Sequence, residues 1–218
     1  QGEGGFYIAP KEFAEALRAL CDKHGIVLIA DEVQTGAGRT GTWLACEQWG
    51  PKAVPDMITM AKSMAGGFPV SAVIGKAELM DKPLPGGLGG TYAGNPLACA
   101  AATASMRLMT SRKVIEGLPA RIAALTRALA PLADHPHVGE IRQRGLMVGI
   151  ELVKDRATRA EYAYGLRAGH QVCLEARPLG ALLRPLGNVV VLMPPLAMTE
   201  AELTRLGEVE FRARRLLP

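Results

Sequence analysis

The sequence predicts an α/β protein in which strands and helices alternate along the chain. Residues 26–30 form a continuous β-rich run, IVLIA, which is typical of a strand covered on both faces. Two further candidate strands follow, at residues 56–60 and 70–75. This alternation favours parallel βα units in a mainly parallel sheet.

Helix signals lie on both sides of these strands. Residues 11–24 predict an amphipathic helix, because Phe13, Leu17 and Leu20 recur at helical spacing. A second helix is expected to begin at Asn95-Pro96 and to continue through an alanine-rich stretch, LACAAATASMRLM, which has a high intrinsic helix propensity.

The second half of the chain repeats the alternation. The expected elements are a helix at residues 119–132, a strand at 146–153, a helix at 167–177, strands at 182–183 and 189–193, and a closing helix. The closing helix carries the capping box Thr199-x-x-Glu202. We predict two domains, residues 1–112 and 113–218.

Composition narrows the classes of function. The chain has 218 residues, 21% of them charged, and a formal net charge of +4, which is typical of a soluble globular protein. Its densest basic group, Arg212, Arg214 and Arg215, is interpreted as a solvated last helical turn, so no nucleic-acid partner is expected. The four cysteines show no metal-ligand spacing, and no apolar run is long enough to span a membrane. We therefore expect no metal site and a cytoplasmic location.

Asp31 is the first candidate site residue. It ends the predicted strand at residues 26–30, where open α/β sheets keep their ligand crevice. A buried carboxylate there can hold the ring nitrogen of a cofactor protonated. One alternative is an acid that only caps the following turn. Another is a nucleotide-hydrolysing protein, in which Asp31 and Glu32 would bind magnesium, although no GxxxxGK[ST] motif occurs in these residues. We interpret Glu32 as structural.

A glycine-rich turn, QTGAGRTG, follows this strand. We expect Gly36, Gly38 and Gly41 to provide positive φ angles in a tight loop.

Lys62 is the second candidate. It stands in the small-residue run MAKSMAGG, so we expect it to be partly buried and nucleophilic; the alternative is a surface lysine beside a glycine turn. Pyridoxal phosphate needs an amine that forms a Schiff base and an acid that holds its ring nitrogen protonated. Asp31 and Lys62 together therefore predict this cofactor.

These motifs, with GGLGGTYAGNP around Thr91, resemble class III (ω-amino acid) aminotransferases of fold type I over nearly the whole chain. The resemblance implies pyridoxal 5'-phosphate bound to Lys62, with Val33 against one ring face and Gln34 hydrogen-bonded to the phenolic oxygen. It also implies a homodimer, because Thr91 in this family reaches the phosphate of the neighbouring subunit.

The resemblance divides between two branches of the family. The first half is most similar to γ-aminobutyrate aminotransferase, whereas the RPLGN motif around Arg184 is similar to the diaminopelargonate type and implies that Arg184 binds the substrate carboxylate. The implied reaction transfers an amino group from an ω-amino acid or amine to a 2-oxo acid. Diaminopelargonate-type transfer and dialkylglycine decarboxylation remain alternatives.

The sequence begins inside the turn QGEGG. In the resembling family a large N-terminal portion, which carries a glycine/serine phosphate-binding loop and a stacking aromatic residue, precedes this turn. We therefore expect this chain to be the C-terminal portion of such an enzyme, and a catalytically silent fragment is a further alternative.

Overall fold

The computed structural model describes residues 1–213, which divide into two compact units. One unit comprises residues 9–115, and the other comprises residues 1–8 together with residues from 116 onwards. The predicted domains, residues 1–112 and 113–218, stay a prediction. The predicted solvated turn at Arg212, Arg214 and Arg215 lies outside the residues whose side chains are described.

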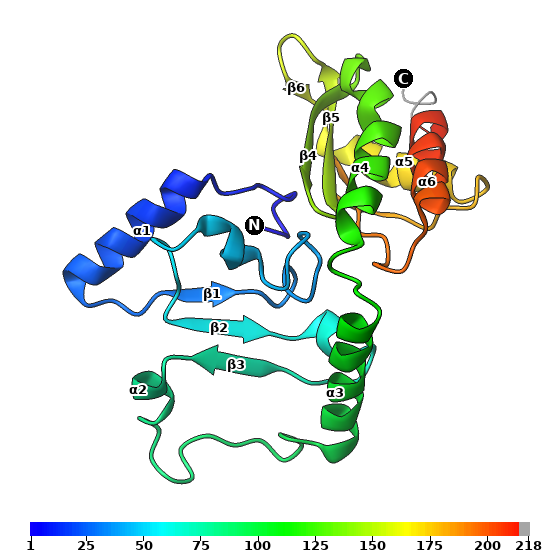
Figure 1. The fold of residues 1–218 in the computed structure, drawn as a ribbon. Coiled ribbons are helices and arrows are strands. Elements are labelled where there is room, and N and C mark those ends of the chain that lie inside the picture. The colour runs from blue at the N-terminus through cyan, green and yellow to red at the C-terminus, as the bar shows by residue number, and fades with distance from the viewer. Residues whose placement is uncertain (214–218) are drawn as a thin grey trace. The chain divides into compact units, whose positions relative to one another are not determined.

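The unit of residues 9–115 is built on a three-stranded sheet with the order β1-β2-β3 (Figure 1). The strands are β1 (Ile29–Asp31), β2 (Met57–Met60) and β3 (Ala72–Gly75). The helices are α1 (Lys11–His24), α2 (Ala77–Met80) and α3 (Pro96–Ser111), with 3-10 turns η1 (Ala45–Trp49) and η2 (Lys62–Ala65).

Both predicted helices of this unit are confirmed, because each has a strong local signal. Helix α1 ends at Gly25, whose φ of 62° places it in the left-handed region that favours glycine. Helix α3 begins after Asn95, whose side chain accepts hydrogen bonds from Leu97 N (3.0 Å) and Ala98 N (3.2 Å).

The predicted sheet needs two corrections. Strand β1 begins at Ile29 and is not covered on both faces, because Ala30 is buried while Ile29 is 54% exposed. Strands β1 and β2 are parallel, as predicted, but β2 and β3 are antiparallel. The segment of residues 61–71 between β2 and β3 contains only the short turn η2, and parallel neighbours need a longer crossover.

A buried charge network ties α1 to this sheet. The Asp56 carboxylate accepts hydrogen bonds from Arg18 (2.7 Å) and from Leu28 N (2.8 Å), and it forms an ion pair with Lys76 (2.6 Å). The hydrogen bonds from Lys76 and Arg18 hold the pKa of Asp56 well below its usual range. Because Leu28 lies just before β1 and Asp56 just before β2, one carboxylate fixes the two strands relative to each other.

The second unit is an antiparallel sheet covered by helices. The strands are β4 (Val138–Arg144), β5 (Met147–Asp155), β6 (Ala160–Glu161), β7 (Arg184–Leu186) and β8 (Val189–Leu192), in the order β4-β5-β8-β7 with β6 beside β5. The helical elements are α4 (Leu118–Leu129), η3 (Ala130–Asp134), η4 (Tyr164–Leu166), α5 (Ala168–Ala176) and α6 (Glu200–Ala213).

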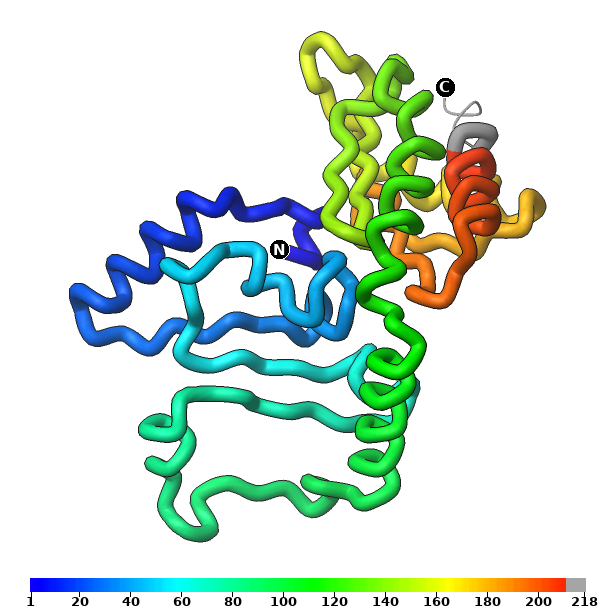
Figure 2. Tube along the Cα trace, viewed as in Figure 1, coloured from blue at the N-terminus to red at the C-terminus, as the bar shows by residue number. Residues whose placement is uncertain are grey.

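The core of this unit lies between the sheet and its helices. Helices α4 and α6 run side by side (Figures 1 and 2). Leu125, Ile150, Leu192 and Leu203 are fully buried, and they come from α4, β5, β8 and α6. Burial of such side chains is the main contribution that stabilises a core of this kind.

Local signals again account for what was predicted here. The capping box of α6 is confirmed, since Thr199 N donates to Glu202 (2.7 Å) and Glu202 N donates to the Thr199 hydroxyl (3.3 Å). Strand β4 was not predicted. The predicted strand at residues 182–183 is wrong, because the pairing of β7 with β8 starts at Arg184 opposite Val191, and Leu182 is 82% exposed.

No helix within residues 1–213 combines the length and the apolar composition needed to cross a membrane.

Candidate active site

The parallel pairing of β1 and β2 brings two candidate residues to the same sheet edge. Asp31 is the last residue of β1 and lies opposite Thr59 of β2. Strand β2 ends at Met60, and Lys62 follows two residues later. The carboxyl ends of parallel strands meet at one edge, which is where open α/β sheets bind ligands. The structure thus places the carboxylate and the amine on neighbouring strand ends.

Asp31 is anchored by the turn that follows it. Its Oδ1 accepts a hydrogen bond from Val33 N at 3.0 Å. The expected burial is wrong for this chain, because Asp31 is exposed. The hydrogen bond holds the carboxylate at the strand end, as the turn-capping alternative also expects.

Glu32, by contrast, is a structural residue, as predicted. It is 2% exposed, and its carboxylate accepts hydrogen bonds from the Thr35 hydroxyl and from Cys46 N (2.7 Å). Its own N–H donates to Thr59 O at 2.9 Å, which fastens the turn to β2. Burial, together with the nearby Glu32 carboxylate, raises the pKa of the Cys46 thiol to about 12. Because both Glu32 oxygens bind donors of the chain, Asp31 and Glu32 do not form the open acid pair that a magnesium site requires.

The glycines of the turn have two different roles. Gly38 (φ 89°) and Gly41 (φ 101°) have the positive φ that was expected. Gly36 does not, so that prediction is wrong for this residue. A Cβ on Gly36 would lie 2.8 Å from Glu32 O, and glycine is needed there because the backbone approaches itself closely.

Lys62 adopts a strained backbone conformation. Its φ is 47°, in the left-handed region that non-glycine residues rarely adopt and that costs on the order of 1–3 kcal/mol. Such strain is concentrated at functional sites. The expected partial burial is wrong for this chain, because Lys62 is exposed. It lines an open hollow on the surface of its unit.

That hollow has the size of a ligand site. Its volume is about 720 Å³, within the range of roughly 300–1,000 Å³ that small-molecule pockets have. Lys62, Phe68, Ser71, Tyr92 and Asn95 are among the residues that line it. It is therefore a concave surface with the candidate lysine in its wall.

The other four candidates divide between the two units. Val33 and Gln34 are half-buried in the turn after β1. Thr91 is exposed in the loop before α3, directly before Tyr92, which lines the hollow around Lys62. Arg184 belongs to the other unit, as the first residue of β7.

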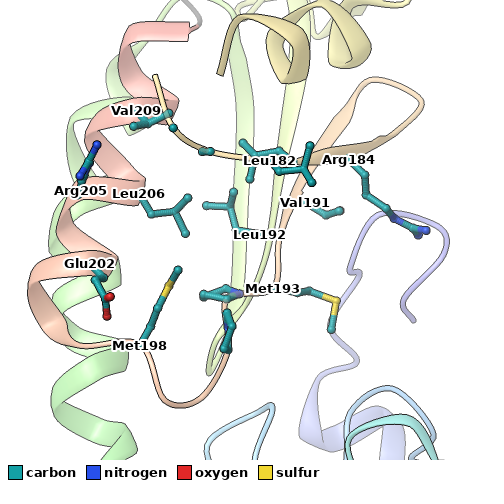
Figure 3. A pocket seen from close by; sticks show the side chains of 15 residues that line it. Leu182, Arg184, Val191, Leu192, Met193, Met198, Glu202, Arg205, Leu206 and Val209 are labelled. Carbon is teal, nitrogen blue, oxygen red and sulfur yellow. The ribbon is translucent and has the colours of Figure 1, made fainter. Parts of the chain in front are cut away.

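Arg184 has a partner that the sequence did not reveal. Its Nη2 lies 3.1 Å from the nearer Glu3 carboxylate oxygen, and both side chains are mostly exposed. Figure 3 shows the Arg184 side chain directed toward the N-terminal segment, away from the apolar hollow of about 650 Å³ that Leu192 and Leu206 help to line. Because 181 positions separate Glu3 from Arg184, no local pattern could have predicted this pair.

Comparison with known proteins gives matches over nearly the whole chain. A family model described as "Aminotransferase class-III" matches residues 1–209. The chain is 49% identical to adenosylmethionine-8-amino-7-oxononanoate aminotransferase of Nitratidesulfovibrio vulgaris, over 94% of this chain and 39% of that protein. It is 44% identical to 4-aminobutyrate aminotransferase GabT of Escherichia coli (strain K12), over 93% of this chain and 47% of that protein.

A solved structure is similar as well. The adenosylmethionine-8-amino-7-oxononanoate aminotransferase of Methanocaldococcus jannaschii aligns with a TM-score of 0.92 at 36% identity, over 98% of this chain and 51% of that chain. The present chain therefore spans about half the length, or less, of the relatives that it matches.

Proposed function

The chain belongs to the aminotransferase class-III family, and we propose that it supplies the lysine and aspartate of a pyridoxal 5'-phosphate site. The family match confirms the predicted resemblance, and the similar solved structure confirms the predicted α/β fold of type I. In the whole protein, this site would transfer an amino group from an ω-amino acid or amine to a 2-oxo acid. The observation that carries the proposal is the placement of Asp31 and Lys62 on adjacent ends of parallel strands.

The residues present fit this cofactor. A carboxylate and an amine lie at one sheet edge, and Lys62 lines a hollow of about 720 Å³. Thr91 offers a hydroxyl in the loop before α3, close in sequence to the lining residue Tyr92. Together these supply the three kinds of group, amine, acid and hydroxyl, that would hold an aldehyde, a ring nitrogen and a phosphate.

When bound, pyridoxal phosphate supplies an aldehyde that takes up amino groups and a ring that withdraws electrons from the donor carbon. Lys62 would attach the cofactor through Nζ. Once released, the same Nζ would take a proton from the donor carbon and pass it to the former aldehyde carbon of the cofactor. Taking up the proton requires the uncharged amine. The positive φ of Lys62 sets the direction in which its side chain leaves the backbone.

Asp31 would keep the ring nitrogen protonated through a charge-assisted hydrogen bond. Its hydrogen bond from Val33 N fixes one carboxylate oxygen and so orients the group. The half-buried Val33 and Gln34 follow it directly, and we assign them to one ring face and to the phenolic oxygen.

Two further assignments concern the phosphate and the substrate. Thr91 would donate its hydroxyl to the phosphate of a neighbouring subunit, so that the working unit is a homodimer. Arg184 would bind the substrate carboxylate, because a guanidinium pairs with a carboxylate in a bidentate manner. A cytoplasmic location is part of the same proposal.

The substrate class follows from relatives of both branches. Their names include 4-aminobutyrate and 8-amino-7-oxononanoate, and both match this chain over more than nine-tenths of its length. Because 4-aminobutyrate carries its amino group at the end of its chain, we propose a donor of that kind. Diaminopelargonate-type transfer and dialkylglycine decarboxylation would use the same Lys62 and Asp31, and product analysis distinguishes them from transfer to a simple 2-oxo acid.

The test is covalent labelling of the lysine. The purified chain is titrated with pyridoxal phosphate, reduced with borohydride, digested and analysed by mass spectrometry. We expect the label on the peptide that contains Lys62, loss of the label in Lys62→Ala, and retention in the matched control Lys82→Ala, which removes another exposed lysine. A label that persists in Lys62→Ala would overturn the lysine assignment. Absence of micromolar binding in the wild-type chain would favour the silent-fragment alternative.

A further inference from the structure

We propose that Arg142 is a positioning residue: it clamps the N-terminal turn, residues 1–8, onto the sheet and thereby holds Glu3 opposite Arg184. The consequence of this clamp for substrate binding rests on the proposed function, in which Arg184 binds a carboxylate.

The guanidinium of Arg142 lies at the centre of the contacts between this turn and the sheet. Its side chain is 5% exposed, and its Nε donates to Gly5 O at 2.9 Å. Its Nη1 donates to Glu140 (2.8 Å) and to Glu151, and its Cζ lies 4.2 Å from the centre of the Tyr7 ring. Three atoms of one side chain thus connect β4 and β5 to the turn.

The charge of Arg142 is maintained despite its burial. Burial opposes the charged form, but the hydrogen bonds that the guanidinium donates to Glu151 and Glu140 outweigh it, so the pKa of Arg142 lies above its ordinary value. Its Nη2 is buried and has no hydrogen-bond partner among the described residues. Such an atom carries a desolvation cost, which the other contacts of Arg142 must offset.

The turn fits the sheet closely. A Cβ on Gly5 would lie 3.2 Å from Arg142 Nη2 and 3.1 Å from Val189 Cγ2, while a Cβ on Gly149 would lie 2.6 Å from Gly5 O. Phe6, at a strained φ of 61°, is buried beside Met147 and the valines of β8. Glycine at positions 5 and 149 allows this approach, and a Cβ at either position would push the turn and the sheet apart.

The docked turn determines where Glu3 lies. Arg184 is paired in register with Val191, and Val191 packs in the same apolar cluster as Phe6. The cluster therefore holds the middle of the turn beside β8, and Glu3 reaches Arg184 on the neighbouring strand β7. If Arg142 no longer donates its hydrogen bond to Gly5 O, the apolar cluster alone holds the turn, and Glu3 can move away from Arg184.

The consequence for binding follows from competition. One exposed guanidinium cannot pair fully with both Glu3 and a substrate carboxylate. Because exposed ion pairs are weak, we expect release of Glu3 to lower the KM for a carboxylate-bearing donor by about 1.5- to 5-fold. The kcat should not change, since Arg142 touches no reacting group.

The first experiment needs neither cofactor nor activity. Hydrogen–deuterium exchange is measured for residues 1–8, where Gly5 N and Phe6 N donate to Gly2 O. Arg142→Lys can still pair with the two glutamates but cannot also reach Gly5 O, so exchange in this segment should rise about tenfold or more, while β5 stays protected. The matched control is Arg144→Lys, an exposed arginine on the same strand, and it should change neither segment.

A second variant keeps the proposal testable if Arg142→Lys does not fold. Gly5→Ala places a methyl group against Arg142 Nη2 and should raise exchange in residues 1–8 without touching Arg142 itself. Unchanged exchange in both variants would overturn the clamp.

The second experiment uses the cofactor-loaded whole protein, with 4-aminobutyrate and butylamine as donors that differ in the carboxylate. Arg142→Lys and Glu3→Gln should each lower the KM for 4-aminobutyrate, leave butylamine unaffected, and show no further effect when combined. Additive effects, or equal changes for both donors, would show that Arg142 does not act through Glu3. A protein that takes up no cofactor would refute the proposed function but would leave the exchange result standing.

Discussion

Replacement of Asp56 by asparagine tests how the chain positions its candidate site. Asp56 is 8% exposed, and it binds Arg18, Lys76 and Leu28 N at 2.6–2.8 Å. Asp56→Asn leaves the buried Arg18 without its main counter-ion. Breaking a buried pair costs about 3–5 kcal/mol. Because Lys76 is half exposed and Arg18 keeps its ion pair with Asp22, we expect the lower end of that range, about 3 kcal/mol.

The pH dependence has a definite sign. The pKa of Asp56 is depressed in the folded chain, chiefly by Lys76 and then by Arg18. A depressed carboxyl pKa stabilises the fold above the unfolded value, about 3.9, and this contribution is lost as the pH falls toward the folded value. The wild-type chain should therefore lose stability below about pH 4 more steeply than Asp56→Asn does.

The assay is urea unfolding at pH 7 and at several values below pH 5. The matched control is Asp22→Asn, which also removes a partner of Arg18 at 2.6 Å, but at a side chain that is 68% exposed, so it should cost less than about 1 kcal/mol. Equal losses for the two variants at pH 7 would refute the argument from burial. Parallel pH profiles of wild type and Asp56→Asn would refute the argument from the pKa.

Four further predictions follow from the site and the elements that carry it. In the cofactor-loaded protein, Arg184→Ala should lower kcat/KM for carboxylate-bearing donors by about 1.5- to 5-fold, because the guanidinium is mostly exposed, while steady-state kinetics with simple amines should show little change. Asp31→Asn should lower kcat by about 10- to 100-fold in the same assay, because a neutral amide cannot hold the ring nitrogen charged. Gly36→Ala should destabilise the chain by about 1–3 kcal/mol in urea unfolding, since its methyl group would meet Glu32 O at 2.8 Å. Thr199→Ala should cost about 0.5–2 kcal/mol by the same measurement, through loss of the cap on α6.

Elements with local signals could be predicted from the sequence. The helix at residues 11–24 was predicted with its observed bounds, because its apolar period and its terminal Gly25 are both local. The same holds for the Asn95 cap and for the Thr199 capping box. Strand β4 was missed because its sequence, VGEIRQR, is rich in charged residues and is held by pairing with β5 rather than by its own propensity.

Partners distant in the chain could not be predicted. The antiparallel direction of β3 depends on the short connection after β2, and the start of β7 depends on its pairing with the distant strand β8. The Glu3–Arg184 pair and the clamp at Arg142 join residues more than 130 positions apart. Side-chain periodicity carries no information about such contacts, so they appear only in the structure.

At the candidate site, the placement of Asp31 and Lys62 agrees with the prediction, but their burial does not. Asp31 and Lys62 reach one sheet edge because β1 and β2 are parallel, with Asp31 in register with Thr59, and this property belongs to the chain itself. Both side chains are nevertheless exposed. Proton transfer by an amine and ring-nitrogen stabilisation by a carboxylate are both stronger where water is excluded. Under the proposed function, these two residues should therefore become less accessible when the cofactor binds and the homodimer forms. A lysine-reactive reagent should label Lys62 quickly in the free chain and slowly in the dimer after its cofactor has been removed, with Lys82 labelled equally in both; equal labelling of Lys62 in the two samples would contradict this expectation.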